Sequence, residues 1–274
     1  MLLAAALSLS AQAATPAANP GRPSFSDNAS ATAAGAMELE LGTAFEPDSF
    51  STNYVLKFGM HPRLDLRIGF EDTLAPVRDP GAFTFLMKGT LIQPRNRVVG
   101  AAIAPFVTVD PGTGQPGFGT FLIASYPQGD VQIDANLLLD AHPSGSGGFR
   151  LDLDPVLTVG FPLAGDLGGY VEAYGIIPTY DQIQPALGLA FGLGYELRKN
   201  IILDASFDAG LLNQDLLPPW KAQIGVTFSG YLIQPEREAN NDGNSGGNNG
   251  NGKNNGKKKN NGNGRKKTPN STLR

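Results

Sequence analysis

Apolar and polar residues alternate along most of this chain with a period of two, and the alternation begins abruptly at residue 37. Residues 37–41 read Met-Glu-Leu-Glu-Leu, and residues 64–70 read Leu-Asp-Leu-Arg-Ile-Gly-Phe. Because successive side chains of a β-strand point to opposite faces, each stretch is predicted to be a strand with one apolar face.

The same pattern predicts twelve strands of about 9–11 residues, a length typical of tilted membrane-spanning strands rather than of strands in soluble proteins. Short connections alternate with longer ones, as in outer-membrane barrels. The predicted fold is all-β: a single antiparallel up-and-down transmembrane β-barrel over residues 36–231. The expected strands are 36–45, 52–60, 63–71, 82–92, 98–108, 117–126, 130–140, 149–161, 168–177, 185–197, 201–211 and 220–230.

The charged residues of these strands all fall on the parity opposite the apolar face. A Lys or Arg on the lipid face at the bilayer midplane costs about 2–4 kcal/mol, which explains such segregation. A secreted, soluble lipid-binding sandwich or barrel would also segregate its charges, so this alternative stays open. On the barrel interpretation the candidates that line the lumen are Glu38, Glu40, Lys57, Asp65, Arg67, Lys88, Asp134, Arg150, Asp152, Asp154, Glu172, Glu196, Asp204, Asp208 and Lys221.

This set contains ten acidic and five basic residues, so an open lumen would prefer cations. Arg150 beside Asp152 and Asp154 on one strand face is a candidate charged constriction. The alternative is that the charges pair across the lumen and close it.

The chain starts with an apolar run that ends in the small-residue pattern Ala11-Gln12-Ala13. We interpret residues 1–13 as a signal peptide, with a start codon upstream because the positive n-region is missing. No stretch approaches the roughly 20 apolar residues of a transmembrane helix. Residues 14–35 lack a period and are predicted to be an extended lead-in segment.

The strand predicted at 185–197 places a run of small residues on its inward face: Ala186, Gly188, Ala190, Gly192 and Gly194. One hypothesis is that the lead-in segment folds into the lumen against this smooth wall as a plug. The other, which we prefer from the sequence, is a bent strand in which glycine relieves the curvature of the barrel.

The net charge of −4 hides an acidic body and a basic tail. Residues 1–239 carry 13 basic and 24 acidic residues, whereas residues 240–274 carry 8 basic and 1 acidic. The tail, 232–274, is rich in Asn, Gly and Lys and is predicted to be disordered. An even-stranded barrel places both ends on one side, so we expect the tail in the periplasm, in contact with anionic envelope polymers and not with nucleic acid.

The residues of enzyme active sites are scarce. The chain has no cysteine, and its two histidines, His61 and His142, lie in predicted turns next to proline. Asp152 and Asp154 have the residue type for acid–base chemistry, but at alternate positions of a strand they more simply line water. We expect no enzyme activity, no cofactor and no metal site.

Residues 22–27 and 34–42, followed by the strand pair at 54–59 and 63–69, resemble the opening of the outer-membrane transporter family named for the meta-pathway of phenol degradation. The resemblance implies a barrel in a Gram-negative outer membrane, with outer-membrane lipid and the barrel-assembly machinery as partners. It also implies transport of small solutes, aromatic or hydrophobic ones among them. The alternative function is a closed structural barrel whose basic tail anchors it to the cell envelope.

Overall fold

The structure of the chain is a computed structural model that describes residues 15–21, 24–76, 79–112, 114–143, 148–180 and 183–234. The predicted signal peptide and all but the first three residues of the predicted tail lie outside the described residues. None of the described residues belongs to a helix long and apolar enough to cross a membrane.

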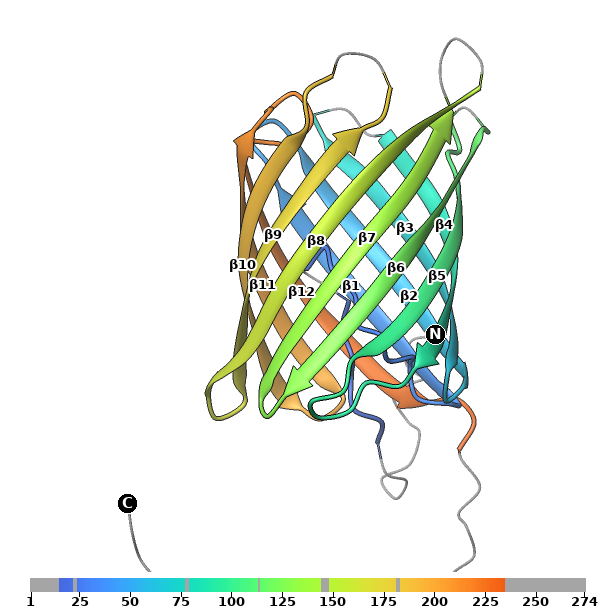
Figure 1. Ribbon diagram of the computed structural model, residues 1–274, viewed down its shortest axis with the longest axis vertical. Helices are drawn as coiled ribbons and strands as arrows, with labels where there is room; N and C mark the ends of the chain where they lie inside the picture. The colour runs from blue at the N-terminus through green and yellow to red at the C-terminus, as the bar shows by residue number, and fades with distance from the viewer. Residues whose placement is uncertain are drawn as a thin grey trace, which may run out of the picture. The chain divides into compact units, whose positions relative to one another are not determined.

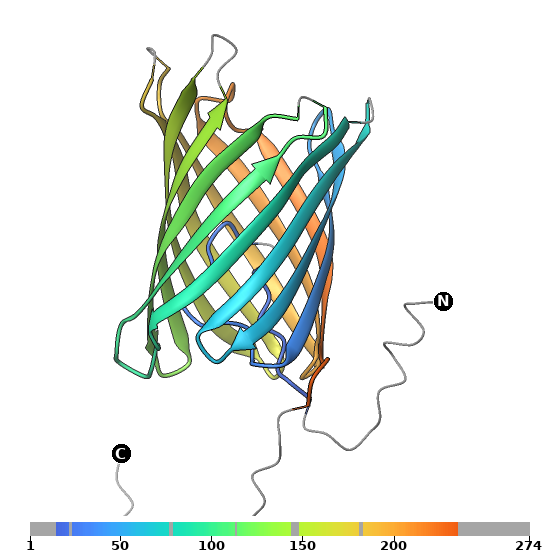
Figure 2. The same ribbon diagram turned by 90° about the vertical axis from the view of Figure 1, so that its right-hand side faces the viewer.

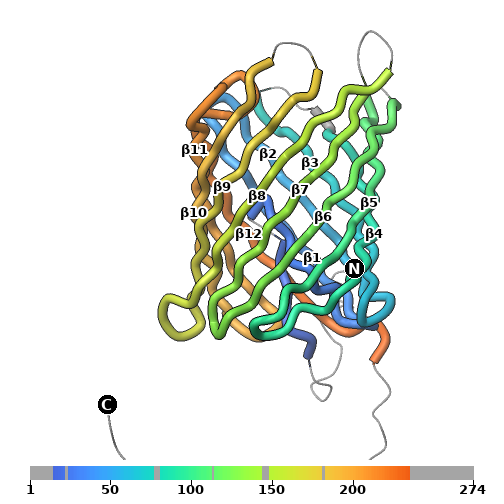
Figure 3. The backbone as a smooth tube through the Cα atoms, in the orientation of Figure 1, coloured from blue at the N-terminus to red at the C-terminus, as the bar shows by residue number. Residues whose placement is uncertain are grey.

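Twelve antiparallel strands form one closed barrel, in which each strand pairs with its neighbours in sequence and β1 pairs with β12 (Figures 1 and 3). The predicted fold class is therefore confirmed. The strands are β1 (Ala36–Phe45), β2 (Phe50–His61), β3 (Leu64–Ala75), β4 (Asp79–Ile92), β5 (Gly100–Val109), β6 (Pro116–Gln128), β7 (Val131–Pro143), β8 (Phe149–Ala164), β9 (Leu167–Pro178), β10 (Ala186–Arg198), β11 (Ile201–Leu212) and β12 (Trp220–Tyr231).

Closure gives every strand a hydrogen-bonded neighbour on both sides. The first strand, β1, lies between β2 and β12, so that Leu39 is opposite Leu56 of β2 and opposite Phe228 of β12. A closed barrel has no free edge, which is the condition for strands to lie in lipid. Most observed strands extend one to three residues beyond their predicted ends.

The outward side chains are mainly apolar and exposed, as the alternation predicts. Examples from around the barrel are Met87, Leu122, Leu157, Val171, Phe191 and Ile224, each at least 43% exposed. The inward side carries the buried charged residues, so the polar face of the sheet is the covered one. This arrangement inverts that of a water-soluble barrel.

The interior is occupied by the chain's own N-terminal region, described over residues 15–21 and 24–35, which we call the luminal segment. It enters from the end of the barrel with the short turns, where the Ala18 N–H bonds to the carbonyl of Lys199 in the β10–β11 turn at 2.9 Å. It then rises into the barrel and returns to the same end to start β1, as the blue trace inside the barrel shows (Figures 1 and 2).

Candidate functional site

The residues predicted to line the lumen divide into those that contact the luminal segment and those that do not. Glu38, Glu40, Lys57, Asp65, Arg67, Lys88 and Glu172 bond or ion-pair with it or with one another, and all are buried. Lys221 is half-buried and also faces the segment, because its ammonium group lies 5.9 Å from the ring centroid of Phe25. Of the others, Asp134, Asp204 and Asp208 are buried, Arg150, Asp152 and Asp154 are half-buried, and Glu196 is exposed near the β10–β11 turn.

The first group of contacts is centred on Lys57, which is 1% exposed. Its ammonium group lies 2.8 Å from Glu38, the residue directly opposite it in the β1–β2 register, and it also pairs with Glu40. The same ammonium donates to the carbonyl of Asn19 at 2.9 Å, while Glu38 accepts from the Asn19 N–H. The cluster therefore fixes the entering arm of the luminal segment to the wall.

The second group joins Asp27 of the luminal segment to β3 and β4. One carboxylate oxygen of Asp27 lies 2.7 Å from the guanidinium of Arg67 and 3.1 Å from the ammonium of Lys88. Burial by itself would raise the pKa of Asp27, but the charges of Arg67, Lys88 and Lys57 outweigh it and hold that pKa well below its ordinary value. Asp27 is therefore an anion at neutral pH and an ionic anchor of the segment.

Glu172 of β9 holds the tip of the luminal segment from the opposite side. It accepts hydrogen bonds from the N–H groups of Phe25 (2.9 Å) and Ser26 (3.1 Å), and from the Ser24 hydroxyl. The Ser26 hydroxyl is also 2.8 Å from that of Thr158 on β8. The tip, residues 24–27, is thus bonded to strands on both sides of the lumen.

The returning arm of the luminal segment is bonded to uncharged side chains as well as to Asp65, which accepts from the Thr32 N–H at 2.8 Å, and to Lys88, which donates to the Asn28 carbonyl at 3.1 Å. Asn136 of β7 accepts from the N–H of Asp27 and donates to its carbonyl, each at 3.0 Å. The Ala29 N–H bonds to the Ser125 hydroxyl at 2.7 Å, and the Ala29 carbonyl accepts from Thr90 at 2.7 Å. Because buried backbone groups need partners, these side chains give a segment without secondary structure a defined path.

The glycines of β10 leave room for aromatic side chains of β9. A Cβ atom at Gly188 would lie 2.3 Å from the ring of Tyr174, and one at Gly192 would lie 2.2 Å from that of Tyr170. The ring of Tyr174 in turn packs 4.2 Å, centroid to centroid, from Phe25.

The lead-in segment does occupy the lumen, as the plug hypothesis predicts. The glycines of the smooth wall, however, receive two tyrosines of β9. That glycine relieves the curvature of β10 stays a prediction.

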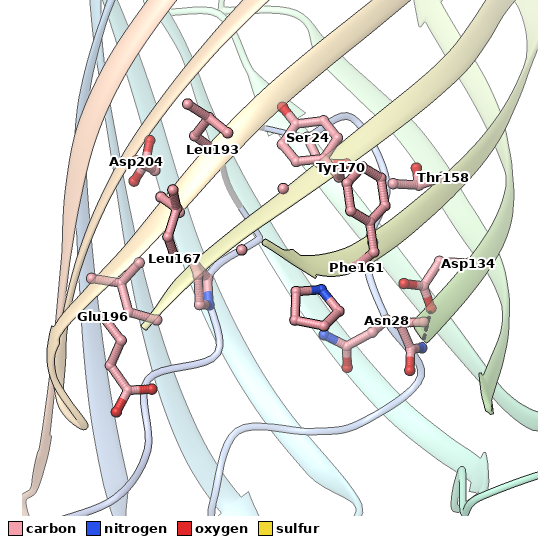
Figure 4. A pocket seen from close by; sticks show the side chains of 18 of the residues that line it. Ser24, Asn28, Asp134, Thr158, Phe161, Leu167, Tyr170, Leu193, Glu196 and Asp204 are labelled. Atoms are coloured by element: carbon pink, nitrogen blue, oxygen red, sulfur yellow. Dashed lines mark hydrogen bonds between the residues drawn. The ribbon is translucent and has the colours of Figure 1, made fainter. Parts of the chain in front are cut away.

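The tip separates two cavities. One, of about 530 Å³, lies toward the short turns and is bounded by residues 24, 26 and 27 together with β7 to β11; Figure 4 shows Ser24, Tyr170, Glu196 and Asp204 around it. The other, of about 500 Å³, is bounded by residues 24–27 and by β1 to β4 and β6, toward the longer loops. Both cavities touch the same four-residue tip, so the tip interrupts the lumen between them.

The predicted constriction around Arg150 lies near the loop end of β8, away from the luminal segment. Arg150 stacks on Tyr180 at 4.8 Å from the ring centroid, and Asp152 lies 3.7 Å from His142. His61 and His142 belong to the ends of β2 and β7, not to turns as predicted. β2 includes His61 as its last residue, and β7 continues through His142 to Pro143. No group of three or more His, Cys, Asp or Glu within the described ranges could hold a metal ion.

Sequence reasoning missed the residues that position the luminal segment: Phe25, Asp27, Ser125, Asn136 and Thr158. The last three share the inward parity of the predicted charged residues, but uncharged polar residues are common in strands of any barrel. The clearest available signal was Asp27, the only acidic residue of 14–35.

No family model and no curated protein sequence matches this chain, so the resemblance to the phenol meta-pathway family stays a prediction. Among solved structures, the NanC porin superposes with a TM-score of 0.56 at 13% identity, covering 70% of this chain and 98% of that one. The KdgM porin superposes with a TM-score of 0.52 at 9% identity, with the same coverage of both chains. At such identities the likeness concerns the fold, and this chain is therefore similar in fold to the porins NanC and KdgM.

Proposed function

We propose that this protein is a channel for small solutes in the outer membrane of a Gram-negative bacterium, and that its luminal segment closes the channel until the tip is displaced. The observation that carries this proposal is the division of the lumen into two cavities by residues 24–27. Without the tip, the two cavities would join into one path along the barrel.

The placement in a membrane is supported by the two faces of the sheet. An exposed apolar outer face around a closed barrel suits a hydrocarbon environment, whereas in water it would be an aggregation hazard. The fold shared with two porins agrees with this placement. Small solutes that are aromatic or hydrophobic remain the expectation from the family resemblance.

The charges of the lumen support a preference for cations. The described residues lining the cavity on the short-turn side include six acidic side chains and no Lys or Arg. The three basic residues nearest the segment, Lys57, Arg67 and Lys88, are already paired with carboxylates. Carboxylates along a path lower the energy of cations in it, so cations should pass more readily than anions once the tip moves.

Single-channel recording in planar bilayers tests the proposal. The refolded chain should show rare openings, and a variant lacking residues 15–35 should show frequent cation-selective steps. Heat-modifiable migration in detergent gels verifies that each variant has folded, because the deletion leaves Arg67 and Lys88 without Asp27.

A reversible lock provides the sharper version of this experiment. The hydroxyls of Ser26 and Thr158 lie 2.8 Å apart, so sulfur atoms at these positions are within reach of a disulfide, and the chain has no other cysteine. The oxidised Ser26→Cys/Thr158→Cys variant should be silent and the reduced one should conduct. Each single-cysteine variant is the matched control. Equal currents in both redox states would contradict closure by the tip.

The second candidate is a permanently closed structural barrel whose basic tail contacts the envelope. The extensive bonding of the luminal segment favours it, because a segment with so many partners is costly to displace. A folded deletion variant that stays silent would support this function against the channel.

A further inference from the structure

Arg67 and Lys88 bind a carboxylate that does not belong to the barrel wall. Asp27 arrives on the luminal segment and places one oxygen 2.7 Å from Arg67 and 3.1 Å from Lys88. Lys88 is fully buried and Arg67 is 9% exposed. For Lys88, Asp27 is the nearer of two carboxylates, since Asp65 lies 4.0 Å away.

The wall around this pair is neutral without Asp27. The three basic residues Lys57, Arg67 and Lys88 face the three wall carboxylates Glu38, Glu40 and Asp65. Asp27 adds one further negative charge and three contacts to buried donors. Removing it leaves Lys88 buried without its nearest counter-charge, which is unfavourable unless another anion takes its place.

We propose that Arg67 and Lys88 form a binding site for small monocarboxylate solutes, which Asp27 occupies in the closed state. A solute carboxylate would replace the Asp27 carboxylate on the same donors. A monoanion fits because it restores the charge that Asp27 supplied, whereas a dianion would add a second negative charge beside Asp65 and Glu40.

The cavity beside the pair specifies the rest of the solute. The cavity of about 500 Å³ on the loop side reaches Arg67 and Asp27 and is also lined by Leu86, Phe121 and Phe25. Phe121 packs against Phe106, with 5.6 Å between ring centroids. This volume is within the usual range for small-molecule sites, and its apolar side suits a solute with an apolar body attached to the carboxylate.

Competition between solute and Asp27 couples binding to displacement of the tip. A tethered group competes at an effective concentration on the order of millimolar or above, so a free solute must compete against that. By linkage, a solute that binds only after Asp27 has left shifts the equilibrium toward the displaced segment. The factor of this shift equals the factor by which the docked segment lowers the affinity for the solute. This step rests on the proposed channel function, but binding itself does not require conduction.

Calorimetric titration of benzoate into the refolded full chain in detergent tests the site. The unmodified chain should bind benzoate weakly, and Asp27→Asn should bind it at least about tenfold more tightly, because the tethered competitor has lost its charge. Asp48→Asn, which removes an exposed carboxylate from the β1–β2 loop, should match the unmodified chain. Benzamide, which has the same ring without the charge, should not bind.

Two further variants keep the test decisive. Adding Arg67→Gln to Asp27→Asn should abolish the gain in affinity. The oxidised Ser26→Cys/Thr158→Cys variant should bind less benzoate than its reduced form, because the locked tip keeps Asp27 on its donors. Equal affinity in the unmodified chain and Asp27→Asn, or equal binding of benzoate and benzamide, would overturn the site.

The two proposals fail in different ways. If Asp27→Asn binds benzoate more tightly but the barrel never conducts, the binding site is supported and the channel function is contradicted. If deletion of residues 15–35 produces currents but no variant binds a carboxylate, the channel function is supported and the binding site is contradicted.

Discussion

The carboxylate of Glu172 accepts a hydrogen bond of 2.9 Å from the backbone N–H of Phe25, across 147 residues of sequence. The same carboxylate accepts from the N–H of Ser26 and the hydroxyl of Ser24, so a single side chain of β9 holds the tip of the luminal segment. The closed state should therefore depend strongly on this residue.

Glu172→Gln should increase channel opening. Hydrogen bonds to a charged group are each worth about 1.5–3 kcal/mol, and a neutral amide retains only part of them. We expect a loss of about 2 kcal/mol in docking of the tip, which is roughly a thirtyfold shift toward the open state. Single-channel open probability measures this shift.

Glu196→Gln is the matched control for Glu172→Gln. It removes the same charge from the neighbouring strand β10, but Glu196 is exposed and its backbone N–H bonds to the carbonyl of Asp166, not to the luminal segment. If the two variants raised the open probability equally, the loss of lumen charge and not the contact with the tip would be the cause.

The barrel was predictable from the sequence because period-two alternation is a local property. The parity of the charged residues places Glu38, Lys57 and Arg67 on one face, and this assignment needs no knowledge of which strands pair. Strand ends were less predictable: β8 continues through Pro162 to Ala164, because a register shift between those two residues accommodates the proline.

The luminal segment was not predictable in the same way. Its path depends on side chains such as Asp65, Ser125 and Glu172, which come from strands far apart in sequence and converge only when the barrel closes. A segment without periodicity carries no local signal of its partners. The space that Gly188 leaves for Tyr174 likewise becomes visible only from the register of β9 and β10.

Gly188→Ala should loosen the tip indirectly. The added methyl carbon would lie 2.3 Å from the ring of Tyr174, so this ring must shift, and its packing against Phe25 must change with it. Overpacking of this kind costs about 1–3 kcal/mol. The expected results are a higher open probability and slower formation of the disulfide in Ser26→Cys/Thr158→Cys.

Gly194→Ala is the control on the same face of β10, since its nearest neighbour, Ile202, would lie 3.9 Å from the added carbon. We expect this variant to behave like the unmodified chain. A similar effect of both substitutions would mean that β10 responds to any added bulk and that Tyr174 has no special role.

Acidification should weaken the ionic anchor at Asp27. Its pKa lies below the ordinary value because Arg67, Lys88 and Lys57 outweigh the effect of burial. A carboxyl with a lowered pKa stabilises the docked state fully above its ordinary pKa of about 4, and this contribution is lost as the pH falls through the lowered value.

The difference in open probability between the unmodified chain and Asp27→Asn isolates this contribution, because all other side chains are the same in both proteins. We expect the difference to be constant between about pH 7 and 5 and to shrink below about pH 4. A difference that grows with acidification would contradict the anchoring role of the Asp27 anion.

Leu122→Arg tests whether the outer face lies in lipid. Leu122 is at the middle of β6, points outward and is 43% exposed. A charge at the bilayer midplane should cost about 2–4 kcal/mol, whereas the same residue near the interface should cost about 0–1 kcal/mol. Leu197→Arg, one residue before the end of β10 near the short turns, provides the interfacial comparison.

Urea unfolding of the barrel in phospholipid vesicles should therefore show a large loss of stability for Leu122→Arg and a small one for Leu197→Arg. Equal, small losses would place the outer face in water and would favour a secreted barrel, because an exposed arginine costs nothing where the surface is already hydrated.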